Sequence, residues 1–291
     1  MDHVKNSKKV LWMVLPCLLL YTVVQIFPLV ESMYYSFFNW KGFGPKEFVG
    51  FANYIKLFTT DPVLPIALKN TFMFAALSIL IMLPLSFLLA VAIRSVVHFS
   101  SGFTTIVYAP GIISTVIVGL IWSTIFNADT GIINAVLCTI GLENCTKVWL
   151  GDPNTAMFII ILINIWQWSG YHALIFYSSL TTIPAQLYEA ASIDGASSLH
   201  KLTRITLPLM ANSIVMNAML IIIGSFKCFD IVYTMTNGGP ADATQMLATY
   251  MYSNTFRRSA YGYGSAISVV IFLLCVIFTV ILQRVKFDNT K

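Results

Sequence analysis

The sequence predicts an all-α integral membrane protein with six transmembrane helices and both termini in the cytoplasm. Hydrophobic residues make up 57% of the 291 residues and charged residues only 10%, far below the roughly 25% of a soluble domain. Six stretches are apolar for about the 20 residues that a helix needs to cross a bilayer. Lysine and arginine gather on the segments of one side, which sets the orientation.

The first expected span begins after three lysines, as the hydrophobic part of a signal peptide does. It is too long for a signal peptide and no small-residue cleavage site follows, so we expect it to be retained. No internal repeat or low-complexity linker divides the chain, and residues 1–291 are expected to form a single transmembrane domain. The six spans are expected at about residues 10–30, 71–93, 104–125, 157–180, 212–232 and 264–285.

The connecting segments carry unequal charge. One side of the membrane has nine basic and four acidic residues, and the other side has eight of each. The first side comprises the two termini, the short segment after residue 93 and the segment 184–210. The positive side is expected to face the cytoplasm. The net charge of +5 therefore has a membrane explanation. Because its basic residues are not clustered among aromatic ones, we expect no nucleic-acid partner.

Several catalytic classes lack their motifs in this sequence. It has no Gly-Lys dipeptide, so it has no Walker loop for a nucleotide phosphate. It has no Cys-x-x-Cys or Cys/His cluster for a metal, and its four histidines are scattered. We expect a chain that is not an enzyme and has no cofactor of its own. Cys138 and Cys145 lie close together in one outer segment, and the sequence leaves their pairing open.

The cytoplasmic segment 184–210 is polar and prone to form helix. It contains EAASIDGASSLHKLTRITLPLM, from Glu189 to Met210. Gly195 permits a tight bend and Pro208 marks the entry to the next span. We expect two short helices joined near Gly195, whose exposed charges and small residues suit a protein partner. A plain amphipathic helix at the membrane surface is the alternative.

The spacing of this segment resembles the EAA motif of permease subunits of ABC importers. The matching residues are Glu189-Ala190-Ala191, Gly195 after three more residues, then Ile205 and Leu207-Pro208. Residues Phe229-Asp230, Thr236-Asn237-Gly238-Gly239-Pro240 and Tyr261-Gly262-Tyr263-Gly264 resemble the carbohydrate branch, which includes the larger maltose permease subunit and the glycerol-phosphate permease. The resemblance implies the type I ABC importer permease fold in a bacterial plasma membrane, without the large outer domain of that maltose subunit.

The resemblance also implies roles and partners. In that family the EAA loop forms a coupling helix that docks into a cleft of the ATPase subunit. Carried over, Glu189 and Gly195 are the key coupling positions, and Ala190, Ala191 and Asp194 belong to the same surface. The implied partners are a second homologous permease, two ATPase subunits that bind ATP and magnesium, an extracytoplasmic solute-binding protein, a sugar substrate and membrane lipid.

A candidate sugar site lies on the fourth span. Asn164, Gln167, Trp168 and Tyr171 follow the i, i+3, i+4, i+7 spacing of one helix face. Polar groups at membrane depth face a cavity or a partner rather than lipid. Amides pair with sugar hydroxyls and aromatic rings stack on a sugar ring. Hydrogen bonding to a partner permease is the alternative, and Trp166, which points off this face, is expected to pack.

Two neighbouring helices complete the expected cavity by resemblance. The third span contributes Gly111 and Thr115 after Pro110, which can open the helix. The fifth contributes Gly224 and Ser225. Near its outer end, Lys227 and Asp230 are expected to neutralise each other as an i, i+3 pair.

The expected function is import of a sugar or short oligosaccharide by alternating access, driven by ATP. One alternative is a permease for glycerol phosphate or another small polar solute. A phosphate would favour arginine or lysine in the cavity, and the Asn164 face carries neither. An ion-coupled secondary transporter is the alternative from another class. It would need carboxylates in the spans and inverted repeats, and the span centres have no Asp or Glu.

Overall fold

The structure is a computed structural model in which the backbone is described for residues 2–95 and 100–288, and side chains for residues 12–94 and 102–284. Helices account for nearly all regular structure in these residues, and the one sheet has two short strands. Backbone contacts divide the chain into two compact units. The first comprises residues 1–61 and 251–270, and the second comprises residues 62–250 and 271–291.

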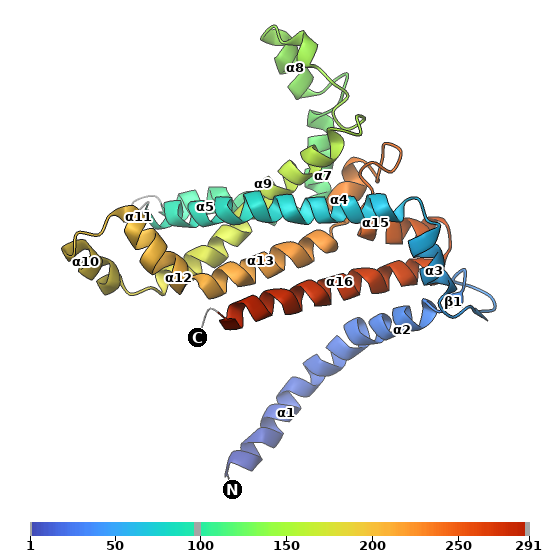
Figure 1. The fold of residues 1–291 in the computed structure, drawn as a ribbon, viewed down its shortest axis with the longest axis horizontal. Coiled ribbons are helices and arrows are strands. Elements are labelled where there is room, and N and C mark those ends of the chain that lie inside the picture. Colours follow the sequence, from blue (N-terminus) through green and yellow to red (C-terminus); the bar gives the residue numbers. More distant parts are fainter. Residues whose placement is uncertain (1, 96–99, 289–291) are drawn as a thin grey trace. The chain divides into compact units, whose positions relative to one another are not determined.

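The first unit begins with a long helix made of α1 (Asp2–Tyr21), η1 (Thr22–Ile26) and α2 (Phe27–Tyr35) (Figure 1). A hairpin of β1 (Phe38–Asn39) and β2 (Glu47–Phe48) follows, and then α3 (Ala52–Thr59). The Asn53 side chain fastens α3 to the hairpin by donating to the carbonyl oxygens of Ser36 at 2.8 Å and Phe38 at 3.0 Å. α15 (Leu247–Tyr252), η5 (Ser253–Arg257) and α16 (Tyr261–Asp288) follow later in the chain, and the first part of α16 belongs to this unit.

The second unit is built around α9 (Ala156–Thr181). A long helix made of α4 (Leu64–Leu77), η2 (Ser78–Met82) and α5 (Leu83–Ser95) packs along it, as does α13 (Ala211–Phe226) (Figure 1). Buried isoleucines of α9 pack with Phe74, Met82 and Val232 in the main apolar core. A second cluster, around Phe176 and Leu180, fills the end of α9 nearest α10 (Ala185–Ile193). α9 is therefore the axis on which the surrounding helices are positioned.

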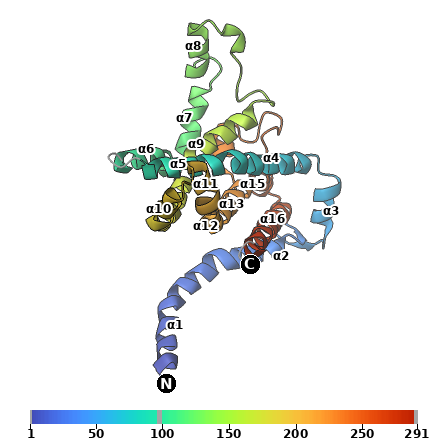
Figure 2. The same cartoon turned by 60° about the vertical axis from the view of Figure 1, so that its left-hand side comes forward.

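The helix expected at residues 104–125 is broken. α6 (Ser100–Ile112) and α7 (Thr115–Ile125) meet at 89° (Figure 2). Ser114 between them has an extended ψ of 131°, and α6 ends at Ile112, one residue after the glycine that follows Pro110. The α6–α7 break therefore lies where the sequence indicated that the helix can open.

The fifth expected span also differs from a single helix. α11 (Ser198–Lys201), η4 (Leu202–Thr206) and α12 (Leu207–Leu209) lead into α13 with a bend of 68°. α13 ends at Phe226, where we expected it to continue to Val232, and α14 (Asp230–Met235) is a separate helix. Lys227 and Asp230 therefore lie at a helix break rather than on one helix.

Four helices in the described residues are long and apolar enough to cross a membrane: Trp12–Tyr35, Leu64–Arg94, Ala156–Thr181 and Tyr261–Arg284. The two bent helix pairs raise the number to six if each pair is one span. The predicted helical membrane fold is confirmed. Between α7 and α9 lie α8 (Ile132–Thr139) and η3 (Glu143–Cys145). Cys138 and Cys145 there are both free and exposed.

Candidate functional site

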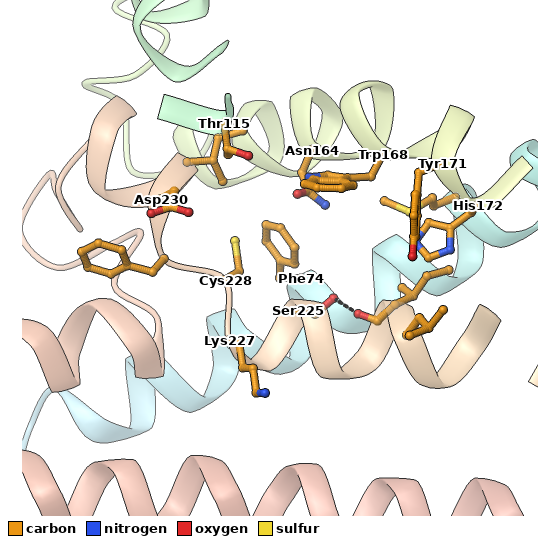
Figure 3. A pocket seen from close by; sticks show the side chains of 16 residues that line it. Phe74, Thr115, Asn164, Trp168, Tyr171, His172, Ser225, Lys227, Cys228 and Asp230 are labelled. Carbon is orange, nitrogen blue, oxygen red and sulfur yellow. Dashed lines mark hydrogen bonds between the residues drawn. The ribbon is translucent and has the colours of Figure 1, made fainter. Parts of the chain in front are cut away.

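A cavity of about 430 Å³ opens in the second unit (Figure 3). α9 forms one wall, and α13 with the linker to α14 forms the facing wall. The lining residues are Phe74, Met82, Thr115, Asn164, Trp168, Tyr171, His172, Leu220, Ile221, Gly224, Ser225, Lys227, Cys228, Phe229, Asp230 and Ile231. This cavity, called the first cavity below, brings together residues of α4, η2, α7, α9, α13 and α14.

Six of the eight residues proposed from the sequence line the first cavity. They are Thr115, Asn164, Trp168, Tyr171, Gly224 and Ser225. The rings of Trp168 and Tyr171 meet edge to face, with centroids 6.0 Å apart. The hydroxyl of Ser225 donates to the carbonyl of Ile221 at 2.7 Å, so its oxygen can still accept a hydrogen bond. Trp166 lies off this face and packs edge to face on Trp122, at 5.5 Å between centroids.

Gln167 lies outside the first cavity and is fully buried. Its Nε2 donates to the carbonyl of Ile113 at 3.1 Å and to the hydroxyl of Thr115 at 3.3 Å, which are the two ends of the α6–α7 break. At about 100° per residue, Gln167 is rotated by roughly 100° from Trp168, whereas His172 is only about 40° away. The face predicted from the spacing therefore wrongly included Gln167 and omitted His172.

Gly111 also lies outside the first cavity and serves helix packing instead. A Cβ at Gly111 would sit 3.4 Å from the carbonyl oxygen of Gln167. A Cβ at Gly170 would overlap the carbonyl of Val107. α6 thus crosses α9 with the two backbones close together, which only small residues permit.

His172 lines the first cavity although it lies outside the face that the i, i+3, i+4, i+7 spacing defines. Its Nδ1 lies 2.8 Å from Oδ1 of Asn217, whose Nδ2 donates to the carbonyl of Ser213 at 3.1 Å. The amide of Asn217 must present its oxygen to the ring, so Nδ1 carries the proton and Nε2 is an acceptor in the neutral ring. The available signal was its position, four residues after Trp168.

The α13–α14 linker supplies the other unexpected residues: Lys227, Cys228, Phe229 and Asp230. Figure 3 shows the Lys227 side chain pointing away from Asp230. The expected i, i+3 neutralisation is therefore wrong, because the helix ends at Phe226 and the two residues no longer share a helix. The presence of two charged residues within the otherwise apolar stretch 212–232 could have indicated this break.

The segment after α9 has the two helices that the sequence predicted, α10 and α11, joined at Gly195. Gly195 has φ +75°. Its N–H donates to the carbonyl of Ser192 at 3.1 Å, and the N–H of Ala196 donates to that of Ala191 at 2.8 Å. These two bonds form a Schellman motif, which closes a helix with a residue in the left-handed conformation. Glycine adopts that conformation without strain.

Side chains brace this turn and tie it to the helix bundle. Nζ of Lys201 donates to Oγ of Ser192 at 2.7 Å, linking α10 to α11. The hydroxyl of Tyr188 lies 2.9 Å from that of Thr206, and the Arg94 guanidinium lies 5.0 Å from the centre of the Tyr188 ring. Arg94 also donates to the carbonyl of Leu180 at 3.2 Å. These contacts connect α10 to both α9 and α5.

The five residues of the expected coupling surface lie at or beside this turn. Glu189, Ala190, Asp194 and Gly195 are exposed, and Ala191 is half-buried. Ile193 beside them is 87% exposed. Within the described part of the chain, neither the Glu189 nor the Asp194 carboxylate forms a side-chain hydrogen bond or salt bridge. These two charges and the exposed apolar Ile193 are available to a partner protein.

A family model described as the binding-protein-dependent transport system inner membrane component matches residues 10–287. The chain belongs to this family. This permease is therefore the non-catalytic membrane subunit of an ABC importer, a multi-pass protein of the inner membrane with no cofactor of its own. The resemblance of the EAA segment pointed to this family, and the family match confirms it.

Two relatives and one solved structure extend the comparison. The probable ABC transporter permease protein YurN of Bacillus subtilis is 33% identical over 290 residues, 99% of this permease and 98% of the relative. The sulfoquinovosyl glycerol transport system permease protein SmoG of Agrobacterium fabrum is 34% identical over 272 residues, 93% and 87% of the two chains. A chain of the bacterial alginate ABC transporter, solved in complex with an alginate pentasaccharide-bound periplasmic protein, superimposes with a TM-score of 0.86. Its identity is 25%, with 100% of this permease and 98% of that chain covered.

Proposed function

We propose that this permease moves a sugar or short oligosaccharide into the cytoplasm by alternating access. The observation that carries the proposal is the first cavity, where the amide of Asn164 lies beside the rings of Trp168 and Tyr171 (Figure 3). An amide both donates to and accepts from hydroxyl groups. Aromatic rings offer flat apolar surface to the C–H face of a sugar ring.

The relatives support a carbohydrate. SmoG is named for sulfoquinovosyl glycerol, and the transporter of the solved structure for alginate. The remaining cavity groups fit a solute rich in hydroxyls, because Ser225 and Nε2 of His172 are acceptors while Thr115 donates or accepts. We infer that an extracytoplasmic binding protein delivers the solute to this permease, because the alginate transporter was solved in complex with an alginate-bound periplasmic protein.

A second candidate is an anionic solute such as glycerol phosphate. Lys227 favours it, because this lysine lines the first cavity although the Asn164 face carries no cation. Asp230 lines the same cavity, and its carboxylate would repel an anion. A neutral saccharide therefore remains the first choice, since a phosphate would meet one cation and one carboxylate in the same wall.

The turn between α10 and α11 is the proposed contact with the ATPase. We infer that Glu189, Ala190, Ala191, Asp194 and Gly195 dock into an ATPase subunit, with two such subunits and a second homologous permease completing the transporter. The braces from Lys201, Tyr188 and Arg94 would carry ATPase closure to α9 and α5. Both helices pack around the first cavity or beside it, so its walls would move with the turn.

The proposal is tested by uptake in cells that lack this chain. The panel comprises labelled mono- to tetrasaccharides, glycerol phosphate, polyamines and amino acids, in cells complemented with the original chain, Glu189→Lys or Glu143→Lys. Glu143 is an exposed acid in η3, far along the chain from α10. We expect one saccharide class to be restored by the original chain and by Glu143→Lys, and at least tenfold less by Glu189→Lys.

The outcomes separate the two parts of the proposal. Restoration of glycerol phosphate, or of a solute without a sugar ring, would overturn the carbohydrate assignment. Equal uptake with Glu189→Lys and Glu143→Lys would overturn the proposed ATPase contact. Immunoblots of membrane fractions confirm that each variant is inserted.

A further inference from the structure

A second cavity, of about 730 Å³, lies in the same unit as the first. Its lining residues are Tyr108, Tyr171, Leu174, Ile175, Ser178, Ser179, Asn212, Ser213, Val215, Met216, Met219 and Gln283. On α9 the first cavity ends at His172 and the second begins at Tyr171. On α13 the second ends at Met219 and the first begins at Leu220. The two cavities therefore follow one another along the same pair of helices.

Tyr171 lines both cavities. Figure 3 shows its ring at the end of the first cavity, beside His172. The ring meets the rings of Trp168 and His172 edge to face, at 6.0 and 5.2 Å between centroids. The residue is 37% exposed, so the core does not enclose the ring. The ring is placed to separate the two spaces or to join them.

A chain of hydrogen bonds links a residue of the first cavity to a residue of the second. His172 lines the first cavity and hydrogen-bonds to Asn217, which is fully buried and donates in turn to the carbonyl of Ser213 in the second cavity. These contacts hold the His172 ring and the Asn217 amide, and the bond at Ser213 is to its backbone carbonyl. Buried polar groups therefore connect the two cavities at the level of Tyr171.

The second cavity also has an unsatisfied polar group. The Ser213 hydroxyl is buried and has no hydrogen-bond partner among the described residues. A buried hydroxyl left unpaired costs about 1–3 kcal/mol, and such groups in proteins usually meet a water or a ligand. Ser178, Ser179, Asn212 and Gln283 add further hydroxyl and amide groups. This wall suits a hydroxyl-rich solute passing along it.

We propose that the second cavity is the cytoplasmic half of the transport path and that the Tyr171 ring is the gate between the two halves. The proposal rests on the transport role proposed above and adds a residue and a second compartment to it. A solute held in the first cavity moves on when Tyr171 turns away. It then exchanges contacts with Asn164 and His172 for contacts with Ser213 and its polar neighbours.

The test uses thiol labelling in inside-out membrane vesicles that contain the whole transporter. Cys228 lines the first cavity and is a native reporter for it. One chain keeps Cys228 and has serine at the other four cysteines. A second chain has serine at all five positions and carries Ser178→Cys, a reporter in the second cavity. A membrane-impermeant methanethiosulfonate is added to the exposed cytoplasmic face.

We expect Ser178→Cys to react rapidly whichever residue stands at position 171. Cys228 should react slowly behind Tyr171 and at least tenfold faster with Tyr171→Ala. Tyr171→Leu should accelerate the labelling of Cys228 to the same extent. Because leucine keeps an apolar side chain at this position, this variant controls for misfolding of Tyr171→Ala. Tyr171→Phe should stay slow because the ring alone closes the path. Trp166→Ala is the matched control on α9, since that ring packs on Trp122 instead.

Two results would overturn the proposal. If Cys228 reacts at one rate with Tyr171, Tyr171→Ala and Tyr171→Leu, the ring is not a gate. If Ser178→Cys is unreactive in every chain, the second cavity is covered by another subunit and is no path. Labelling needs no knowledge of the solute, so a failure of the carbohydrate assignment leaves this result readable, and the reverse also holds.

Discussion

Two amide side chains three residues apart on α9 have different surroundings. Gln167 is fully buried and bridges the broken ends of α6 and α7 through Ile113 and Thr115. Asn164 is half-buried and lines the first cavity. The same functional group therefore holds the fold together at one position and is available to a solute at the other. Residue type and helical spacing do not distinguish them, because the difference comes from the helix that lies opposite.

Substitution should separate these two roles. Gln167→Met keeps the volume but removes both donors, leaving the Ile113 carbonyl unpaired, at a cost of about 1–3 kcal/mol. We expect a lower midpoint of thermal unfolding in detergent. Asn164→Leu should leave that midpoint within about 1 °C of the original, because surface-like changes are usually within ±0.5 kcal/mol, while uptake falls. The opposite pattern, a stable Gln167→Met and an unstable Asn164→Leu, would contradict these assignments.

At the scale of elements, the turn between α10 and α11 depends on backbone conformation. Gly195 has φ +75°, and no atom lies within 4 Å of where its Cβ would be. A side chain there meets no steric obstacle, so conformational strain is the only local cost. Gly141, in the turn after α8, has φ +78° and the same open surroundings. It is a matched position in a segment without a coupling role.

We expect Gly195→Ala to lower uptake and solute-stimulated ATP hydrolysis by roughly 5- to 30-fold. The left-handed conformation costs an alanine about 1–2 kcal/mol. A free energy of that size changes the ratio of two states by roughly 5- to 30-fold. Gly195→Asn should recover most of the activity, because asparagine tolerates this conformation. Gly141→Ala, with equal strain, should transport normally. Equal loss in both alanine variants would show a general effect of strain rather than a role in coupling.

At the scale of the whole molecule, the charge asymmetry predicts which segments face the cytoplasm. The segment with α10 and α11 lies on the positive side, together with both termini, and the segment with α8 and η3 lies on the other. Cys138 and Cys145 are free and exposed in that second segment. They are native reporters of its side of the membrane.

An impermeant maleimide should therefore label Cys138 and Cys145 in right-side-out vesicles without permeabilisation. In a chain with serine at all five cysteines, the exposed Ser198→Cys in α11 should be labelled only after the membrane is opened. The positive-inside distribution is the physical reason. Labelling of Ser198→Cys in sealed vesicles would reverse the topology and, with it, the side on which an ATPase can dock.

The helical membrane fold, the family and the position of the turn at Gly195 could all be predicted from the amino-acid sequence. Each of these follows from local properties, namely apolar length, the distribution of charge, and a motif whose glycine is required by its own backbone torsion. Six cavity residues also followed from the helical spacing of Asn164, Trp168 and Tyr171 together with the resemblance.

Which neighbour each side of α9 contacts depends on the three-dimensional packing of the helices. It turned Gln167 toward the α6–α7 break, brought His172 into the cavity wall, and ended α13 at Phe226 so that the linker closes the cavity. The spacing of a helix gives the directions of its side chains, but what occupies each direction depends on contacts between segments far apart in the chain. The two successive cavities that share Tyr171 are such a consequence, because their walls come from several elements.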